Sequence, residues 1–145
     1  MHRGASIITH IYYGFDLKNM FFRLDSSGNL KDEKVADLAF FINFLNPKGV
    51  DVEISIRPQE HRVSAMLFRV ENGERRQFAV INTVAANDII ELAVPFELLG
   101  VKANDEMQIF VTVERSGSEI EKWPYRGYIL LKVPTDDFEA MMWQV

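Results

Sequence analysis

Three aromatic side chains near the C-terminal end have the residue types that could bind a ligand. Trp123, Tyr125 and Tyr128 gather around Pro124. Flat, exposed aromatic side chains bind pyranose rings by apolar contact, while neighbouring polar groups bond the hydroxyls. If they are exposed and coplanar they form a saccharide platform, so we predict Trp123, Tyr125 and Tyr128 as ligand-binding residues. Alternatively, Trp123 packs under a sheet edge, and Trp143 closes one end of the fold.

Two adjacent aromatic pairs lie near the N-terminal end. Tyr12-Tyr13 and Phe21-Phe22 fall in segments with the composition of strands. Adjacent residues of a strand point to opposite faces, so one member of each pair must look away from the core unless a second layer covers it. An exposed aromatic row of this kind is suited to docking a neighbouring domain.

Patterns typical of catalysis or metal binding are weak in this sequence. His2, His10 and His61 have none of the spacings of a metal site. Glycoside hydrolysis needs two carboxylates roughly 5–10 Å apart, and the candidates are Glu53, Glu91, Glu97, Glu114 and Glu121. All five are expected at outward-facing positions or caps. No nucleophile elbow and no phosphate loop occurs. We therefore predict no catalytic residue, no metal, no cofactor, and no enzyme activity for the isolated chain.

Composition limits the class of partner. The chain has 145 residues, 48% of them apolar, which is enough for one core without disulfides. The formal net charge is −5 and the basic residues are scattered, whereas nucleic-acid binding needs clustered Lys and Arg. No apolar run reaches the roughly 18 residues of a membrane span, and no signal-peptide layout opens the chain. We therefore expect a chain that binds neither nucleic acid nor membrane. Absence of cysteine fits a reducing compartment, and we expect a cytoplasmic protein.

Apolar and polar residues alternate along most of the chain, with breaks at Gly, Asn, Asp or Pro. This pattern predicts an all-β antiparallel β-sandwich with about nine to ten strands and at most two short helices. The expected strands cover residues 6–15, 20–24, 38–45, 50–56, 63–70, 77–84, 106–115, 118–123 and 127–133, plus the start of 88–100. Residues 50–56 predict one apolar and one acidic or polar face, whereas residues 38–45 predict a central strand buried on both faces. Asn72-Gly73 and Ser116-Gly117 predict hairpin turns.

Residues 88–100 (DIIELAVPFELLG) predict a strand that continues into a one-turn helix. Ile90, Leu92 and Val94 alternate with other residues in the strand. Pro95 suits the first helical position because its missing N–H has no partner there, and Gly100 suits the left-handed stop.

This segment belongs to a wider set of short motifs. Together with IYYGFDLKNMFFRLD near the start and EIEKWP, ILLKVP and MMWQV near the end, it resembles the C-terminal domain of family-57 glycoside hydrolases, related to carbohydrate-binding and DOMON-like sandwiches. The resemblance covers residues 12–143. It implies a single domain over residues 1–145 that is a fragment of a longer enzyme acting on α-glucans, of the α-amylase or a related type.

The resemblance also implies partners, namely the catalytic domain of the same polypeptide, an α-glucan and a second copy of the chain. Two functional hypotheses follow. In the first, this is a non-catalytic accessory domain that stabilises or docks the catalytic domain. In the second, it is a carbohydrate-binding module that holds α-glucan through exposed aromatic side chains.

Overall fold

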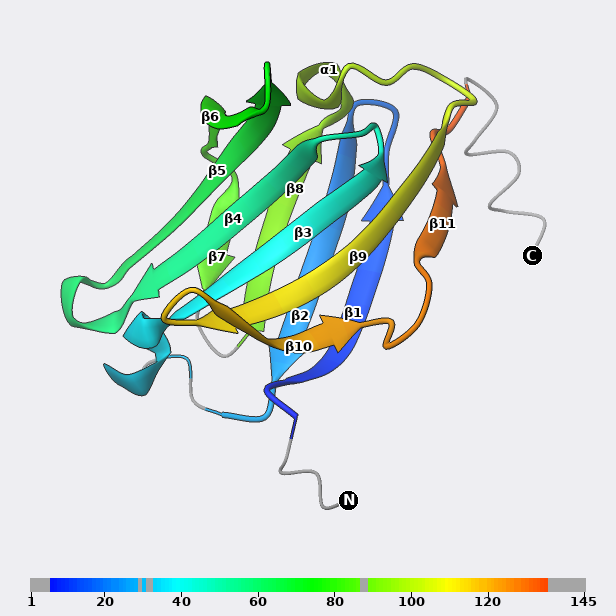
Figure 1. The fold of residues 1–145 in the computed structure, drawn as a ribbon. Coiled ribbons are helices and arrows are strands. Elements are labelled where there is room, and N and C mark those ends of the chain that lie inside the picture. The colour runs from blue at the N-terminus through cyan, green and yellow to red at the C-terminus, as the bar shows by residue number, and fades with distance from the viewer. Residues whose placement is uncertain (1–5, 29, 31–32, 87–88, 136–145) are drawn as a thin grey trace.

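Two antiparallel sheets, packed face to face, make up the fold (Figure 1). The computed structural model describes residues 6–28, 30, 33–86 and 89–135. The small sheet has the order β1-β2-β8-β7, with β1 (Ile8–Phe15), β2 (Asn19–Ser26), β8 (Ile89–Pro95) and β7 (Val84–Ala86). The large sheet has the order β10-β9-β3-β4-β5-β6, with β10 (Ser118–Trp123), β9 (Glu106–Arg115), β3 (Leu38–Asn46), β4 (Val50–Arg57), β5 (Arg62–Glu71) and β6 (Glu74–Ile81), and β11 (Ile129–Lys132) also pairs with β9. The predicted all-β antiparallel sandwich is confirmed.

Eleven strands are present in the part of the chain that the structure describes, against the nine to ten expected. The difference arises where the sequence predicted one strand over residues 77–84. The chain leaves the large sheet after Ile81, and Thr83 bonds to the small sheet instead. Its Oγ1 donates to the Ala93 carbonyl (2.7 Å), and its own carbonyl accepts the Ala93 N–H (2.9 Å). The helical elements are short: η1 (Glu33–Asp37), η2 (Pro58–Glu60) and α1 (Phe96–Leu99).

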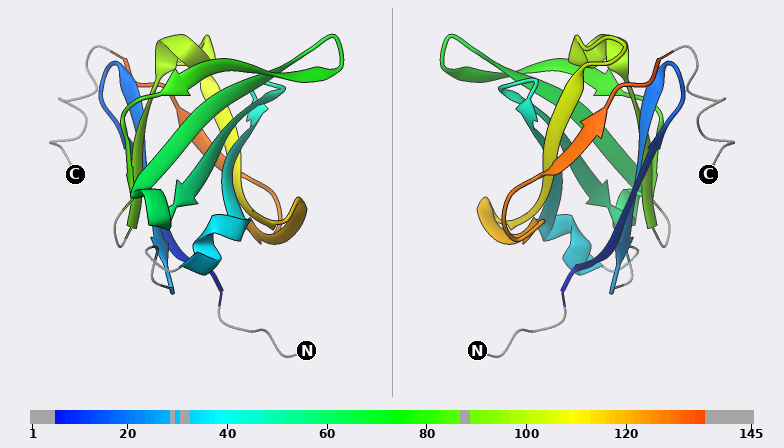
Figure 2. Two further views of the ribbon diagram at one scale, coloured as in Figure 1. Left: turned by 90° about the vertical axis from the view of Figure 1, so that its left-hand side faces the viewer. Right: turned by 90° about the vertical axis from the view of Figure 1, so that its right-hand side faces the viewer.

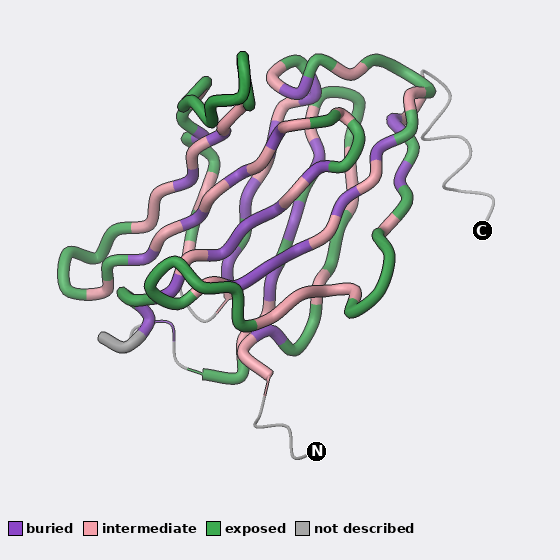
Figure 3. Tube along the Cα trace, viewed as in Figure 1, coloured by how far each residue is buried: buried purple, intermediate pink, exposed green. Residues whose placement is uncertain are grey.

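Burial follows the predicted alternation (Figure 3). Along β4 the buried residues Val50, Val52, Ile54 and Ile56 face the small sheet, while Asp51, Glu53 and Ser55 are only partly buried. On β3, Phe41 is 9% exposed although it lies on the outer face, so this strand is buried on both faces at its centre. Leu45 at its end is 47% exposed. The core is therefore one apolar layer between the sheets.

Residues in the left-handed conformation form the two predicted hairpin turns. Asn72 and Gly73 have φ of 52° and 80°, and Ser116 and Gly117 have 51° and 84°. Two consecutive positive φ values are typical of hairpin turns that match the twist of the strands. Gly100, with φ of 70°, ends α1 as predicted. Pro95 lies one position earlier than expected: it ends β8 in an extended conformation, and the helix begins at Phe96.

One carboxylate joins the two sheets at their edges. Glu121 on β10 accepts hydrogen bonds from the backbone N–H groups of Ile7 and Ile8 (3.1 Å for Ile8), where the chain enters β1. The same carboxylate accepts the indole N–H of Trp123 (3.0 Å). Three donors therefore converge on a part-buried anion that links the first strand of the small sheet to the edge of the large sheet.

The large sheet extends beyond the small one at two hairpins. Figure 2 shows the β5–β6 and β9–β10 hairpins bending away from the small sheet. The outer face of the large sheet consequently lies between two projecting hairpins. The outer face of the small sheet, on the opposite side of the molecule, has no such flanks.

Candidate functional site

The aromatic residues predicted as ligand-binding occupy two different environments. Trp123 pairs with Val111 of β9, packs against the core and bonds Glu121. Tyr125 and Tyr128 lie between β10 and β11 and are 65% and 47% exposed. The structure thus gives Trp123 a packing role, as the alternative interpretation proposed, and leaves the two tyrosines at the surface. Trp143 and His2 lie outside the described residues.

The five candidate carboxylates are distributed over the fold. Glu121 bonds backbone and indole, and Glu53 pairs with Arg75. Glu91 lies on the outer face of the small sheet, and Glu97 is exposed in α1. Glu114 is partly buried on the outer face of the large sheet, where burial raises its pKa and the carboxylates of Glu53 and Glu119 raise it further.

Neither a metal cluster nor a membrane-spanning helix is found in the described part of the chain. No group of three or more His, Asp or Glu side chains is arranged to hold a metal ion there. No helix within those residues is long and apolar enough to cross a bilayer.

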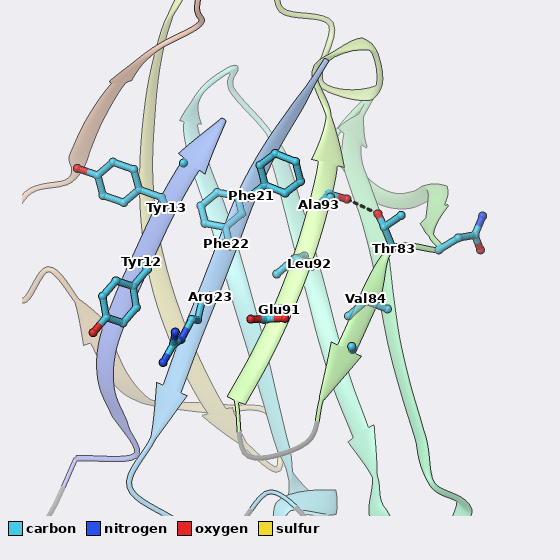
Figure 4. A pocket seen from close by; sticks show the side chains of 13 residues that line it. Tyr12, Tyr13, Phe21, Phe22, Arg23, Thr83, Val84, Glu91, Leu92 and Ala93 are labelled. Atoms are coloured by element: carbon cyan, nitrogen blue, oxygen red, sulfur yellow. Dashed lines mark hydrogen bonds between the residues drawn. The ribbon is translucent and has the colours of Figure 1, made fainter. Parts of the chain in front are cut away.

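A depression of about 580 Å³ lies on the outer face of the small sheet (Figure 4). Its lining comes from all four strands and from the segment before β7: Tyr12, Tyr13, Gly14, Phe21, Phe22, Arg23, Asn82, Thr83, Val84, Ala85, Glu91, Leu92 and Ala93. The sequence predicted an outward aromatic row here. Tyr12 and Phe21 are its outward members and are 49% and 42% exposed. Tyr13 and Phe22 lie opposite each other on the other face, where Phe22 is buried in the core and Tyr13, on the edge strand β1, is 48% exposed.

Strand register arranges this face in two rows. Tyr12 lies opposite Arg23, which lies opposite Glu91, so these three side chains share a row across β1, β2 and β8 (Figure 4). In the next row Phe21 lies between Gly14 and Ala93. Because glycine has no side chain and alanine has only a methyl group, the Phe21 ring has open space on both sides.

The first row is held together by charge and stacking. The Arg23 guanidinium lies 4.8 Å from the centre of the Tyr12 ring, and it makes a two-point ion pair with Asp25 (2.7 and 3.1 Å). The His10 ring stacks on Tyr12 from the neighbouring position, with centroids 6.0 Å apart. Tyr12 is thus a fixed wall of the depression.

The outer face of the large sheet carries a more enclosed cluster. Arg75 on β6 reaches to β4 and bonds Asp51 at two points (2.6 and 2.9 Å) and Glu53 at one (2.9 Å). Its guanidinium also lies 3.6 Å from the centre of the Phe68 ring and 5.7 Å from that of Phe41. The cation therefore bonds two carboxylates while it covers aromatic surface.

A similar pairing continues toward the other edge of this sheet. Lys122 lies 5.0 Å from the centre of the Phe110 ring. Asn43 donates a hydrogen bond to the Thr112 hydroxyl (3.0 Å). Thr112 is the only polar residue that is buried among the described residues. Polar side chains of this face with partners inside the domain are therefore Arg75, Asp51, Glu53, Asn43 and Thr112.

Sequence reasoning missed the polar half of the small-sheet depression. Glu91, Ala93 and Thr83 lie far along the chain from Tyr12 and Phe21, and only the β2–β8 register brings them together. The alternation of residues 88–100 did indicate that Glu91 and Ala93 point outward. It carried no signal for which strand lies beside them.

Comparisons with known proteins identify no relative: no family model, no curated protein and no solved structure matches this chain. The resemblance to family-57 C-terminal domains stays a prediction. Functional inference therefore depends on the geometry of the two outer faces.

Proposed function

We propose that this chain is a non-catalytic accessory domain of a larger glycoside hydrolase of the family-57 type, and that it docks on and stabilises the catalytic domain of the same polypeptide. The observation that carries this proposal is the outer face of the large sheet. There, half-buried aromatic rings lie beside charged groups that are already paired, between two projecting hairpins.

Paired charges favour burial of this face against a second domain. An isolated charge loses its hydration when an interface forms, and this desolvation opposes binding. Arg75 bonds both Asp51 and Glu53, so each charged group of this cluster has a partner when it is covered, and the three groups together carry a net charge of −1. The aromatic surface around it contributes the apolar core that domain interfaces have.

Exposed apolar side chains extend this face at its β9–β11 edge. Leu130 on β11 lies opposite Gln108 of β9 and is 56% exposed. Tyr128 immediately precedes β11, and Leu45 lies at the irregular end of β3 beside Gln108. All three side chains are about half exposed. We assign this edge to the interface with the catalytic domain.

The test uses the proposed full-length polypeptide, in which this chain follows the catalytic domain. Leu130→Asp should lower the melting temperature of the whole protein by several degrees, while the isolated 145-residue domain, in which Leu130 is half exposed, should melt almost as before. Leu17→Asp is the matched control, because Leu17 is 52% exposed in the β1–β2 turn of the small sheet. Equal melting of all three whole proteins would refute docking through the large sheet. An unchanged melting temperature after deletion of the domain would refute the stabilising role.

A second function, binding of carbohydrate, is favoured by one specific observation. The small sheet holds an uncovered aromatic ring, Phe21, in a depression with polar side chains at its rim. This face lies on the side of the sandwich opposite the proposed interface, so docking and ligand binding are compatible.

A further inference from the structure

We propose that the depression on the outer face of the small sheet is a saccharide-binding site in which the Phe21 ring stacks on a pyranose. This site shares no residue with the group Trp123, Tyr125 and Tyr128. The assignment of an α-glucan as its ligand rests on the proposed function, whereas the site and its neutral, hydroxyl-rich ligand class follow from the geometry.

Phe21 is the stacking surface because its ring is 42% exposed and its face is free of stacked partners among the described residues. Within the residues that the structure describes, no cation or second ring stacks on it, in contrast to Tyr12, Phe68, Phe78 and Phe110. Its neighbours across the strands are Gly14 and Ala93. A Cβ built at Gly14 would meet nothing within 4 Å. A flat ring can therefore lie over Gly14 against the face of Phe21.

The glycine at this position is not required by the backbone. Gly14 has no left-handed φ, and it occupies a strand, where glycine is unfavourable. Its backbone conformation and the space above it would accept a larger residue. The missing side chain thus has its main consequence in the open volume beside Phe21.

Polar groups at the rim suit hydroxyls better than phosphates or acyl chains. Arg23 is already paired with Asp25, and Glu91 adds a further carboxylate, so the local charge is more negative than positive. An anionic ligand is disfavoured in such a field. Thr83 and Glu91 offer acceptors, and the Arg23 guanidinium offers donors at the same rim. A neutral ligand with one apolar face and many hydroxyls matches this set.

The size and shape of the site fit an oligosaccharide. Its volume of about 580 Å³ lies within the range of roughly 300–1,000 Å³ for small-ligand sites. The lining residues extend from β1 to β7 across the whole sheet (Figure 4). A ligand longer than one ring can therefore continue along the row of Tyr12, Arg23 and Glu91.

The experiment is a calorimetric and NMR titration of the 145-residue chain with maltoheptaose, with cellohexaose as the comparison ligand. Phe21→Ala and Gly14→Val should each weaken maltoheptaose binding at least tenfold, the first by removing the stacking surface and the second by filling the space beside it. Phe21→Trp should retain binding. Phe78→Ala is the matched control, because Phe78 is 50% exposed on β6 and does not line the depression, and it should bind like the wild type. Tyr128→Ala tests the loop before β11 as the alternative site. Melting temperatures of all variants establish that they are folded.

Several results would overturn the inference. Absence of binding by the wild-type chain, or equal binding by Phe21→Ala, removes the site. Loss of binding in Tyr128→Ala alone moves the site to the loop before β11. Equal affinity for cellohexaose removes the α-glucan assignment. None of these results alters the melting test with Leu130→Asp, so failure of this site is distinguishable from failure of the docking function.

Discussion

On the large sheet Arg75 covers aromatic rings and holds two carboxylates, whereas on the small sheet Arg23 holds one carboxylate and leaves the neighbouring Phe21 42% exposed. Arg75 reaches from β6 over Phe68 to β4, so its contacts tie three strands together. Arg23 bonds Asp25, two residues away on its own strand, and lies over the Tyr12 ring. The same residue types thus make a closed surface on one face and an open one on the other.

The comparison indicates that an aromatic ring is free to bind a ligand when no arginine extends across the strands to lie over it. A cation held by residues of another strand lies over the rings between them. An arginine whose carboxylate partner is on the same strand, as for Arg23, lies over the ring next to it in the same cross-strand row. The five predictions that follow test this comparison and the joint between the two sheets.

The largest effect is expected at the joint itself. Glu121→Ala removes the acceptor for the N–H groups of Ile7 and Ile8 and for the indole of Trp123. Leaving such donors unpaired should lower the free energy of unfolding by about 2–3 kcal/mol, measured by urea denaturation. Glu119→Ala on the same strand, where the side chain is exposed, should change it by less than about 0.5 kcal/mol. Similar losses in both variants would show that the joint does not stabilise the sandwich.

The next effect compares the two arginines directly. Arg75→Met should lower the free energy of unfolding by about 1–2 kcal/mol, since Asp51 and Glu53 lose their shared partner. Water partly replaces the guanidinium, because the Arg75 side chain is 38% exposed. Arg23→Met should lower the free energy of unfolding by less, because Arg23 pairs with one carboxylate, two positions away on the same strand. Equal losses in the two variants would contradict the comparison.

Stability should depend on pH with opposite signs on the two sheets. Burial and neighbouring carboxylates raise the pKa of Glu114 on the large sheet above the 4.5 of a free side chain. The stability linked to this raised pKa is present below pH 4.5 and is lost as the pH rises through the folded-state pKa. The free energy of unfolding of Glu114→Gln should therefore equal that of the wild type in acid and exceed it at pH 7 by under about 1 kcal/mol.

Asp16 in the β1–β2 turn is the opposite case. Its carboxylate accepts the N–H groups of Lys18 (2.7 Å) and Asn19 (2.6 Å), and these bonds, that of Lys18 foremost, hold its pKa below 3.8. The resulting stability is present above pH 3.8 and is lost as the pH falls through the folded-state pKa. Asp16→Asn should therefore be less stable than the wild type at pH 7, and the free energies of unfolding of the two proteins should become equal in acid. Parallel pH curves for Asp16→Asn and Glu114→Gln would contradict both assignments.

The smallest effect concerns the open space on the small sheet. Gly14→Val should leave the free energy of unfolding unchanged or raise it by about 0.5 kcal/mol, because a β-branched residue suits a strand and nothing obstructs its Cβ. Thermal melting measures this. A clear loss of stability would mean that the absent side chain at Gly14 has a structural role.

Local pattern was enough to predict the architecture. Along β4, period-two alternation places Val52 and Ile54 in the core, and this needs no knowledge of other strands. Gly100 was predicted as the left-handed stop of α1 because few other residues adopt that conformation. Asn72-Gly73 specified its hairpin for the same reason.

Contacts between distant strands were beyond such reasoning. Arg75 bonds Asp51 across 24 positions, and Glu121 bonds Ile8 across 113. The pairing of β2 with β8, which places Ala93 beside Phe21, is set by packing of the whole sheet. The outward aromatic side chains were therefore predictable, whereas the surroundings that leave Phe21 open were not.

The bond between Glu121 and Trp123 has a practical consequence for following this molecule in solution. One carboxylate holds both the backbone at the start of β1 and the indole N–H, so detachment of that strand changes the polarity around the indole ring. With Trp143 replaced by Phe, Trp123 is the sole tryptophan. Its emission maximum then reports fraying of the first strand without any attached dye.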